Sequence, residues 1–305
     1  MDVTAEDARS MKDGGATMDD RPPTFAPNIT RDEMFWRSIR RPLPGADSNI
    51  ERFMLAAATT WIEPGDFVVD LGANHGQHAR VFAIRLGRSG SLLLVEADPS
   101  LAADLENGAL HSSIKIEVVN AAVGDPDSRE VVFYRHQTRD QEGSLFRRED
   151  GTTYQELRVP ATSLDSLLAG RAVPSFVKID VEGAEFSTLR GAAGLLRDHA
   201  PLVACEVSFD SEIESPESLN YTLLELIETL GEANWSLFAL DGRRITGPDS
   251  GDPQFRMHYQ CWLAKSGSRA EQFVTTIVPL LASAFAWAST ETPPYPFHLD
   301  KHPAT

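Results

Sequence analysis

Cysteine is scarce in this chain, because only Cys205 and Cys261 occur among its 305 residues. Both lie inside apolar, strand-like runs, so we expect buried free thiols in a reducing compartment rather than a disulfide framework. No apolar run approaches the ~18 residues that a membrane helix needs, and the acidic segment 1–20 lacks the apolar core of a signal peptide. The sequence therefore predicts a cytoplasmic protein without a membrane span.

Positive charge is also in short supply. Lys and Arg number 28 against 45 Asp and Glu, which gives a formal net charge of −17. An acidic surface repels phosphate backbones unless a dense basic patch offsets it, and the arginines within 37–41 and 147–148 form no such patch. We expect a neutral or weakly charged small-molecule partner and no nucleic acid. The sequence does not indicate the oligomeric state.

Hydrophobic residues make up 42% of the chain, enough for a substantial core. Short apolar runs with strand character alternate with helical segments, which is typical of a parallel sheet covered on both faces. The expected strands of this sheet are 67–71, 91–96, 114–119, 175–180, 202–207, 235–240 and 258–264. The expected helices are 31–41, 48–61, 78–86, 100–109, 184–196, 223–230 and 271–287. The pattern predicts an α/β, Rossmann-like, mostly parallel seven-stranded sheet.

Composition and pattern divide the chain into four parts. We expect a flexible leader at 1–28, N-terminal helices at 29–62, an α/β domain at 63–265, and a C-terminal helix and tail at 266–305. Inside the domain, segments 130–134 and 154–159 read as two strands flanking a polar loop. They predict a β insertion after the third strand, at about 124–160.

The first strand opens onto a glycine-rich turn that contains Asp70, Gly72, Asn74 and Gly76. Such a turn lets a ligand approach the backbone, and the next helix offers free N–H groups. The turn lacks the Gly-x-Gly-x-x-Gly dinucleotide fingerprint. Its acid-x-Gly-x-x-x-Gly form occurs in S-adenosylmethionine methyltransferases, where it surrounds the amino-acid end of the cofactor.

The next two strands end in residues that suit a nucleoside. Glu96 ends the second strand, where a carboxylate can accept hydrogen bonds from both ribose hydroxyls and would repel a 2′-phosphate. Ala97 follows it. Asn120 and Ala121 follow the third strand, where an amide and small side chains suit an adenine slot, although a plain turn explains them equally well.

Four segments together resemble the FkbM-type methyltransferases. They are Val69–Gly76, Val95–Pro99, Val159–Asp165 and Val177–Glu185, and the last, with the run Lys-Ile-Asp-Val-Glu-Gly-Ala-Glu, is the most specific. The resemblance covers roughly residues 65–210 and departs at His75, where an aliphatic residue is common. It implies a class I methyltransferase fold, S-adenosylmethionine as cofactor, and methylation of a hydroxyl group on a natural product or sugar.

That resemblance also suggests catalytic residues. In a class I sheet Asp180 ends the strand beside the first one, so its carboxylate faces the crevice and could bind the cofactor or take the acceptor's proton. Glu206 ends the next strand, and His75 could act as a base or orient the acceptor. Glu182 lies in the loop after Asp180, whereas Glu185 is better explained as favourable charge at a helix N-terminus.

The insertion loop is expected to hang over the reacting methyl group, with Glu142, Ser144 and Glu182 near the acceptor. Two carboxylates on neighbouring strand ends could also hold Mg²⁺, but no third ligand is clearly placed, so a metal is not favoured.

Two other functions share part of this pattern. A NAD-dependent oxidoreductase would use the same ribose-binding acid, although the third glycine of its fingerprint is absent. A non-catalytic binding protein could retain a degenerate methyltransferase fold, but Asp70, Gly72, Gly76, Glu96 and Asp180 are all intact.

Overall fold

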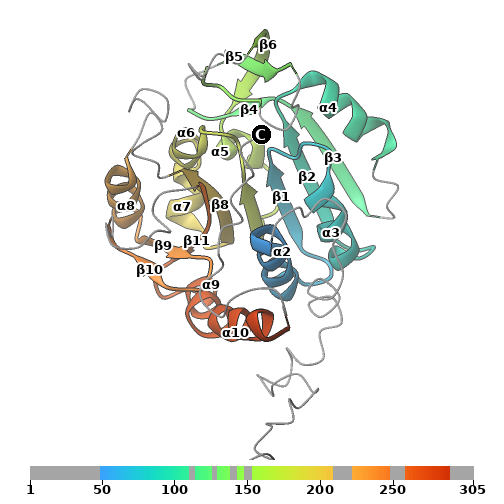
Figure 1. Cartoon of the computed structure of the whole chain (residues 1–305). Coiled ribbons are helices and arrows are strands. Elements are labelled where there is room, and N and C mark those ends of the chain that lie inside the picture. The colour runs from blue at the N-terminus through green and yellow to red at the C-terminus, as the bar shows by residue number, and fades with distance from the viewer. Residues whose placement is uncertain are drawn as a thin grey trace, which may run out of the picture.

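The computed structural model describes residues 49–109, 114–125, 129–137, 143–147, 153–208, 222–247 and 258–288. In this part of the chain the main sheet has eight strands in the order β10-β9-β11-β8-β7-β1-β2-β3 (Figure 1). Its strands are β1 (Phe67–Leu71), β2 (Ser91–Glu96), β3 (Lys115–Asn120), β7 (Phe176–Ile179), β8 (Leu202–Ser208), β9 (Trp235–Ala239), β10 (Arg244–Ile245) and β11 (His258–Lys265).

Strand direction divides the sheet into two parts. Strands β3, β2, β1, β7 and β8 pair in parallel, whereas β11 is antiparallel to both β8 and β9, and β9 is antiparallel to β10. The mostly parallel α/β sheet agrees with the expectation, but the count of seven strands was wrong. The eighth strand, β10, is a two-residue edge that folds back on β9 through a turn in which Gly242 adopts φ +90°. Its two residues, Arg244 and Ile245, are too few to show the alternation of polar and apolar residues that would distinguish a strand from a loop in the sequence.

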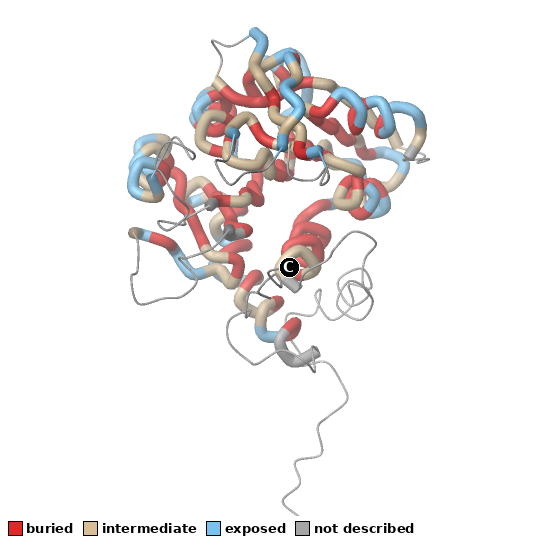
Figure 2. Tube along the Cα trace, turned by 45° about the horizontal axis from the view of Figure 1, so that its top comes forward, coloured by how far each residue is buried: buried red, intermediate tan, exposed pale blue. Residues whose placement is uncertain are grey.

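Two groups of helices cover the two faces of the sheet. On one face lie α2 (Asn49–Trp61), α3 (Gln77–Leu86), α9 (Arg269–Gln272) and α10 (Val278–Ala288). On the other lie α5 (Leu164–Leu168), α6 (Glu185–Arg190), α7 (Ala193–Asp198) and α8 (Leu223–Glu232). Each face buries its own apolar cluster, and the central strands are buried almost throughout (Figure 2). Helix α4 (Pro99–Asp104) follows β2 and is capped by Asp98.

The insertion forms a second, three-stranded sheet above the carboxyl ends of the central strands (Figure 1). Strand β5 (Glu130–His136) pairs antiparallel with β6 (Tyr154–Thr162), which also pairs in parallel with β4 (Ala122–Val123). The two expected insertion strands are thus present, and β4 joins them because the chain enters the insertion directly from β3.

Some helical expectations need revision. The expected helix at 184–196 is two helices, α6 and α7, because Gly191 ends the first and its carbonyl accepts the Asp165 N–H. The expected C-terminal helix is α9, a π-helical turn (Phe273–Ile277) and α10. The helix expected at 31–41 and the leader lie outside the described residues.

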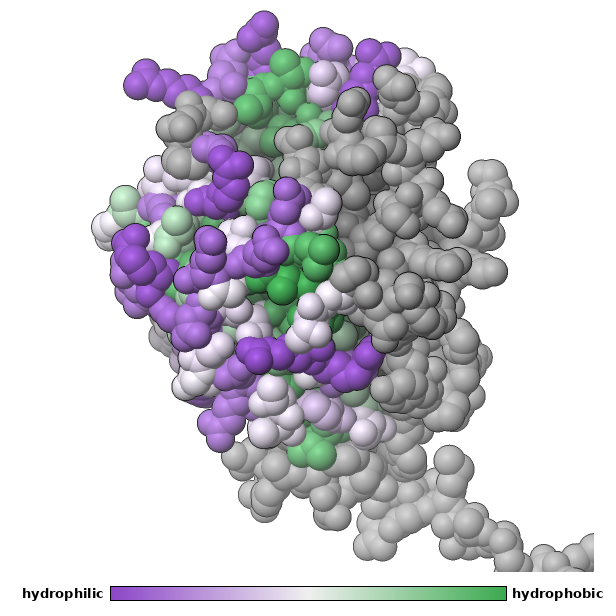
Figure 3. Space-filling view, turned by 90° about the vertical axis from the view of Figure 1, so that its left-hand side faces the viewer, coloured by the Kyte–Doolittle hydropathy of each residue, from purple (hydrophilic) through white to green (hydrophobic). Residues whose placement is uncertain are grey.

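Cys205 and Cys261 are both buried and form no disulfide, although they lie directly opposite each other in the β8–β11 pairing. Among the described helices, none has the length and apolar character to cross a membrane. Figure 3 views the side of the molecule that carries α8 and β9, where hydrophilic side chains predominate and apolar ones are scattered among them.

Two glycines provide a test of local packing. A Cβ on Gly191 would lie 2.1 Å from the carbonyl oxygen of Gly124, and backbone atoms cannot rotate away. Gly191→Ala is therefore expected to destabilise the protein by about 1–3 kcal/mol. Gly231→Ala, in helix α8 with nothing within 4 Å, should be stabilising by about 0.5–1 kcal/mol. Urea unfolding of both variants checks this, and equal midpoints would contradict it.

Candidate active site

The turn between β1 and α3 has a left-handed backbone at three positions, with φ +74° at Gly72, +48° at Asn74 and +73° at Gly76. A Cβ on Gly72 would lie 1.7 Å from the carbonyl oxygen of Asp180. Only glycine fits there, because both the conformation and the contact exclude a side chain. The turn is consequently held against the end of β7, and the ends of β1 and β7 form one site.

Glu96 ends β2 and reaches back to this turn. Its carboxylate accepts the backbone N–H of Asn74 at 2.7 Å and that of Asp98 at 2.8 Å. The residue is 6% exposed, and its burial raises its pKa while the two N–H bonds oppose that rise. The side chain is therefore fixed in one orientation, with lone pairs left on both oxygens for further hydrogen bonds.

The residues expected to form the adenine slot lie beside Glu96. The Asn120 side-chain amide donates to the carbonyls of Glu96 and Ala97, at 2.8 and 3.0 Å, so it shapes the turn after β2. Ala121 is buried and donates its N–H to the Glu96 carbonyl at 3.1 Å. The turns after β2 and β3 are thus joined by hydrogen bonds, and the observed bonds of the Asn120 side chain are made to protein rather than left for a ligand.

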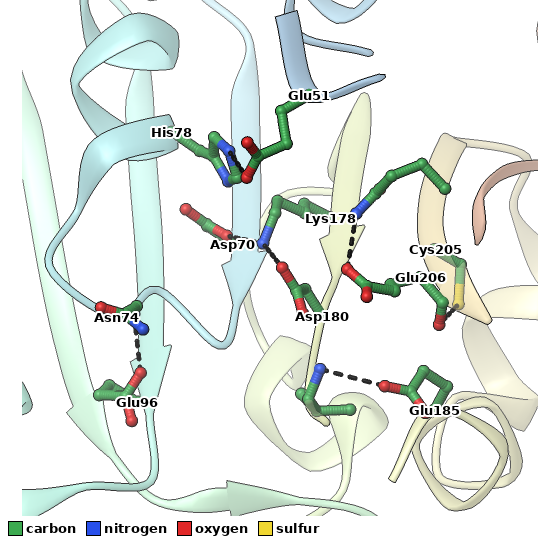
Figure 4. Close-up of polar contacts among 12 residues, drawn as sticks. Glu51, Asp70, Asn74, His78, Glu96, Lys178, Asp180, Glu185, Cys205 and Glu206 are labelled. Carbon is green, nitrogen blue, oxygen red and sulfur yellow. Dashed lines mark hydrogen bonds and ion pairs between the residues drawn. The ribbon is translucent and has the colours of Figure 1, made fainter. Parts of the chain in front are cut away.

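A buried ion cluster joins the two central strands (Figure 4). The Nζ of Lys178 lies 2.9 Å from Asp180 Oδ2 and 3.6 Å from Asp70 Oδ1. Asp70 is fully buried, and neither of its oxygens has a hydrogen-bond partner among the described residues. Desolvation raises the pKa of Asp70 to about 6, even though the charge of Lys178 opposes the rise.

Lys178 remains charged in this setting. Burial alone would lower its pKa, but the negative charges of Asp180 and Asp70 outweigh that effect and raise the pKa above its usual value. The Asp180 side chain is about one quarter exposed, at 23%. It is therefore the most exposed member of the cluster.

Glu206 lies on β8, on the same face of the sheet as Asp180 (Figure 4). It accepts a 2.8 Å hydrogen bond from the amide of Gln260 on β11. Burial, and then the charges of Asp180 and Glu182, raise the pKa of Glu206 well above its usual value. Glu206 is thus biased toward its neutral form, in which the carboxyl can donate a hydrogen bond.

Glu185 begins α6, as its interpretation as a helix N-terminal charge requires. It is 2% exposed and accepts the backbone N–H groups of Gly183 at 3.0 Å and Val181 at 3.3 Å. Its role is to shape the loop after β7 rather than to contact a ligand. Burial raises the pKa of Glu185 to about 7.

The insertion contacts both loops of the site. Arg135 on β5 makes a bidentate ion pair with Asp98, in the turn that follows Glu96. At the other end, Ser144 Oγ donates to the carbonyl of Glu182 at 2.5 Å. Ser144 and Glu182, which the sequence assigns to the acceptor, are therefore in direct contact. Glu142 lies outside the described residues.

The two histidines of the first turn have different surroundings. His75 follows Asn74, whose side-chain oxygen accepts the His75 backbone N–H at 2.6 Å. His78 lies on α3, partly buried with 11% of its side chain exposed and 3.8 Å from Glu51 of α2 (Figure 4). Burial lowers the pKa of His78 to about 3, so it is neutral at physiological pH.

No three His, Cys, Asp or Glu side chains in the described part of the chain converge as metal ligands.

The sequence did not identify three residues that contact the site, namely Lys178, Gln260 and Arg135. A lysine between apolar residues in a central strand, two positions before an acid, was a signal for a buried ion pair. Gln260 and Arg135 gave no such signal, because their partners lie far away in the sequence and are set by strand pairing.

The family model of the methyltransferase FkbM domain matches residues 70–234, more than half of the chain. This chain belongs to the FkbM methyltransferase family. The matched region of this FkbM family member contains the glycine turn, Glu96, the insertion and the buried ion cluster. Methyltransferases of this kind use S-adenosylmethionine. No curated protein shows significant sequence similarity to the chain.

Solved structures give only distant similarity. An FkbM methyltransferase from Methylobacillus flagellatus is 17% identical with a TM-score of 0.40, over 78% of this chain but only 60% of that one. Precorrin-6y C5,15-methyltransferase from Geobacter metallireducens is 10% identical (TM-score 0.40; 71% and 88% coverage). Fibrillarin from Aeropyrum pernix, with bound S-adenosylmethionine, is 16% identical (TM-score 0.37; 75% and 76% coverage). These values are too low to transfer a substrate or a site residue.

Glu185 gives a prediction for stability against pH. Its pKa rises from 4.5 to about 7 on folding, so folding is most favoured below pH 4.5 and loses stability as the pH rises through 7. The loss amounts to about 3 kcal/mol from this group. Glu185→Gln removes that titration, so the variant should gain stability relative to wild type between pH 4.5 and 8.

Urea unfolding at pH 4.5, 6 and 8 measures this difference. The control is Glu228→Gln, on the exposed side of α8. If the free energies of unfolding of wild type and Glu185→Gln change in parallel with pH, the pKa of Glu185 is not raised by folding.

Proposed function

We propose that this FkbM family member transfers a methyl group from S-adenosylmethionine to a hydroxyl oxygen of a small molecule, natural product or sugar. The observation that carries the proposal is the packing of Gly72 against the Asp180 carbonyl. It puts a glycine turn suited to a cofactor beside a carboxylate that a ligand can reach. A neutral acceptor fits the formal net charge of −17, and two buried free thiols support a location in the cytoplasm.

The residues present fit the cofactor. The left-handed turn from Gly72 to Gly76 leaves room for close approach to the backbone, and the buried oxygens of Asp70 have no hydrogen-bond partner among the described residues. Asp70, Gly72, Asn74 and Gly76 would hold the amino-acid end, and Glu96 the ribose hydroxyls. Ala97, Asn120 and Ala121 would border the adenine. When bound, S-adenosylmethionine supplies an activated methyl group on a positively charged sulfur.

The protein's own groups would then handle the acceptor. Asp180 would accept a hydrogen bond from the acceptor hydroxyl and take its proton as the oxygen becomes nucleophilic. Lys178 keeps the Asp180 carboxylate fixed at 2.9 Å, and Glu206 would donate a hydrogen bond to a neighbouring group of the acceptor. Ser144 and Glu182 would close the acceptor side and exclude water. His75 is the remaining candidate base.

Ligand binding and a search for the acceptor test this function directly. Calorimetry with S-adenosylmethionine and with NAD separates a methyltransferase from an oxidoreductase, because only one should bind. Labelled S-adenosylmethionine incubated with extracts of the source organism should then label a small hydroxylated compound. Binding without any transfer would favour a non-catalytic protein on this fold.

Glu96→Ala should weaken S-adenosylmethionine binding at least tenfold without unfolding the protein. The reason is that each charge-assisted hydrogen bond to the ribose contributes ~1.5–3 kcal/mol. Glu117→Ala is the matched control, since Glu117 lies on β3 and pairs with Arg171. Calorimetry on both variants checks the effect, and unchanged affinity in Glu96→Ala would exclude this residue as the ribose ligand.

Asp180→Asn should separate chemistry from cofactor binding. The amide keeps the size and one acceptor oxygen but cannot take a proton, so methyl transfer should fall by ~10²–10⁴ while S-adenosylmethionine affinity stays within a few-fold. Single-turnover transfer and calorimetry measure the two effects. A parallel loss of both would assign Asp180 to the cofactor instead, and full kcat would remove it from the mechanism. Loss of wild-type activity in EDTA, restored by Mg²⁺, would assign it to a metal.

A further inference from the structure

Lys178 occupies an unusual place for a lysine, in the middle of the central strand β7. The residue is 1% exposed, and its neighbour on the same face, Phe176, belongs to the apolar core. Burying an ammonium group is costly unless opposite charges and hydrogen bonds compensate it. An apolar side chain would satisfy the packing of the strand, so the function of Lys178 must lie in its partners.

Those partners come from two different parts of the site. Asp70 belongs to β1 and precedes the glycine turn by two residues, whereas Asp180 follows β7 and is reachable from the crevice. Lys178 pairs opposite Asp70 in the β1–β7 register and contacts both carboxylates (Figure 4). It is therefore the one described side chain that bridges the cofactor turn and the acceptor side by direct ion pairs.

We propose that Lys178 is a positioning residue, which holds Asp70 and Asp180 as two carboxylates of fixed orientation so that the site presents negative charge to a cationic cofactor. This inference rests on the proposed function, because the cationic ligand is S-adenosylmethionine. It adds a residue to that function and explains why a charge is buried in the central strand.

The charges around Lys178 decide what its removal does. Asp70 faces it from β1, Asp180 from its own strand and Glu206 from β8, while neutral His78 on α3 and Glu51 on α2 lie beyond them. Lys178 is the main group that opposes the rise in the pKa of Asp70 to about 6. Without it, Asp70 takes up a proton at a higher pH, and its carboxyl loses the negative charge with which it would attract a cationic ligand.

The direction of the pH effect follows. When Asp70 is protonated, a cationic ligand binds more weakly, and raising the pH restores the affinity. For wild type we expect S-adenosylmethionine affinity to fall as the pH drops through about 6. For Lys178→Met the same fall should occur at least one pH unit higher, with affinity at pH 7 at least tenfold weaker than wild type.

Calorimetric titration with S-adenosylmethionine from pH 5.5 to 8.5 measures the midpoint of this profile. Repeating it in two buffers of different ionisation enthalpy counts the protons released on binding, which a merely structural role would not change. Lys265→Met is the matched control, because Lys265 lies on β11 and donates to the carbonyls of Leu196 and Arg197. Its midpoint should equal that of wild type.

Two double variants keep the test decisive. Lys178→Met/Asp70→Asn lacks the titrating carboxyl, so its affinity should be weak and independent of pH. If Lys178→Met does not fold, Lys178→Met/Asp180→Asn removes the buried pair as a unit. In this double variant the pH midpoint of S-adenosylmethionine affinity should still be higher than in wild type, because Lys178 affects the pKa of Asp70 more than Asp180 does.

The outcomes distinguish a failure of the proposed function from a failure of the role assigned to Lys178. No S-adenosylmethionine binding by the wild-type protein would overturn the proposed function, and this inference with it. Wild-type binding together with an unshifted midpoint in both Lys178 variants would overturn the role of Lys178 alone. A pH-dependent profile in Lys178→Met/Asp70→Asn would overturn the part assigned to Asp70.

Discussion

The close contact between the Gly72 backbone and the Asp180 carbonyl is the constraint on which the site depends. It exists because β1 and β7 are neighbours in the sheet, so the turns that leave their carboxyl ends must share the same space. A side chain at position 72 would separate these turns. The buried pairing of Lys178 with Asp70 and Asp180 lies directly below that contact and needs the same strand spacing.

The insertion extends this arrangement on both sides. Its Arg135 anchors the turn that follows Glu96, and its Ser144 anchors the loop that carries Glu182. The small sheet is therefore anchored both at the turn after β2 and at the loop after β7.

Much of the fold was predictable because its signals are local. The apolar strands 67–71, 91–96 and 202–207 and the glycine turn after Leu71 are readable from neighbouring residues alone. The break in the helix at Gly191 and the short strand β10 were not, because each depends on a contact made elsewhere in the fold. For the site, Asp70, Glu96 and Asp180 could be named from strand ends. The Glu206–Gln260 bond required the pairing of β8 with β11, and the raised pKa of Glu206 required its burial beside Asp180 and Glu182.

The strand order also has a consequence for biosynthesis. Strand β1 pairs on one side with β2, which follows it closely, but on the other side with β7, where Val68 lies opposite Phe176. During translation the N-terminal half thus presents an open, apolar strand edge until the insertion and β7 have been made. A chaperone that covers the edge between these points would protect it, and truncation before β7 would leave an aggregation-prone fragment.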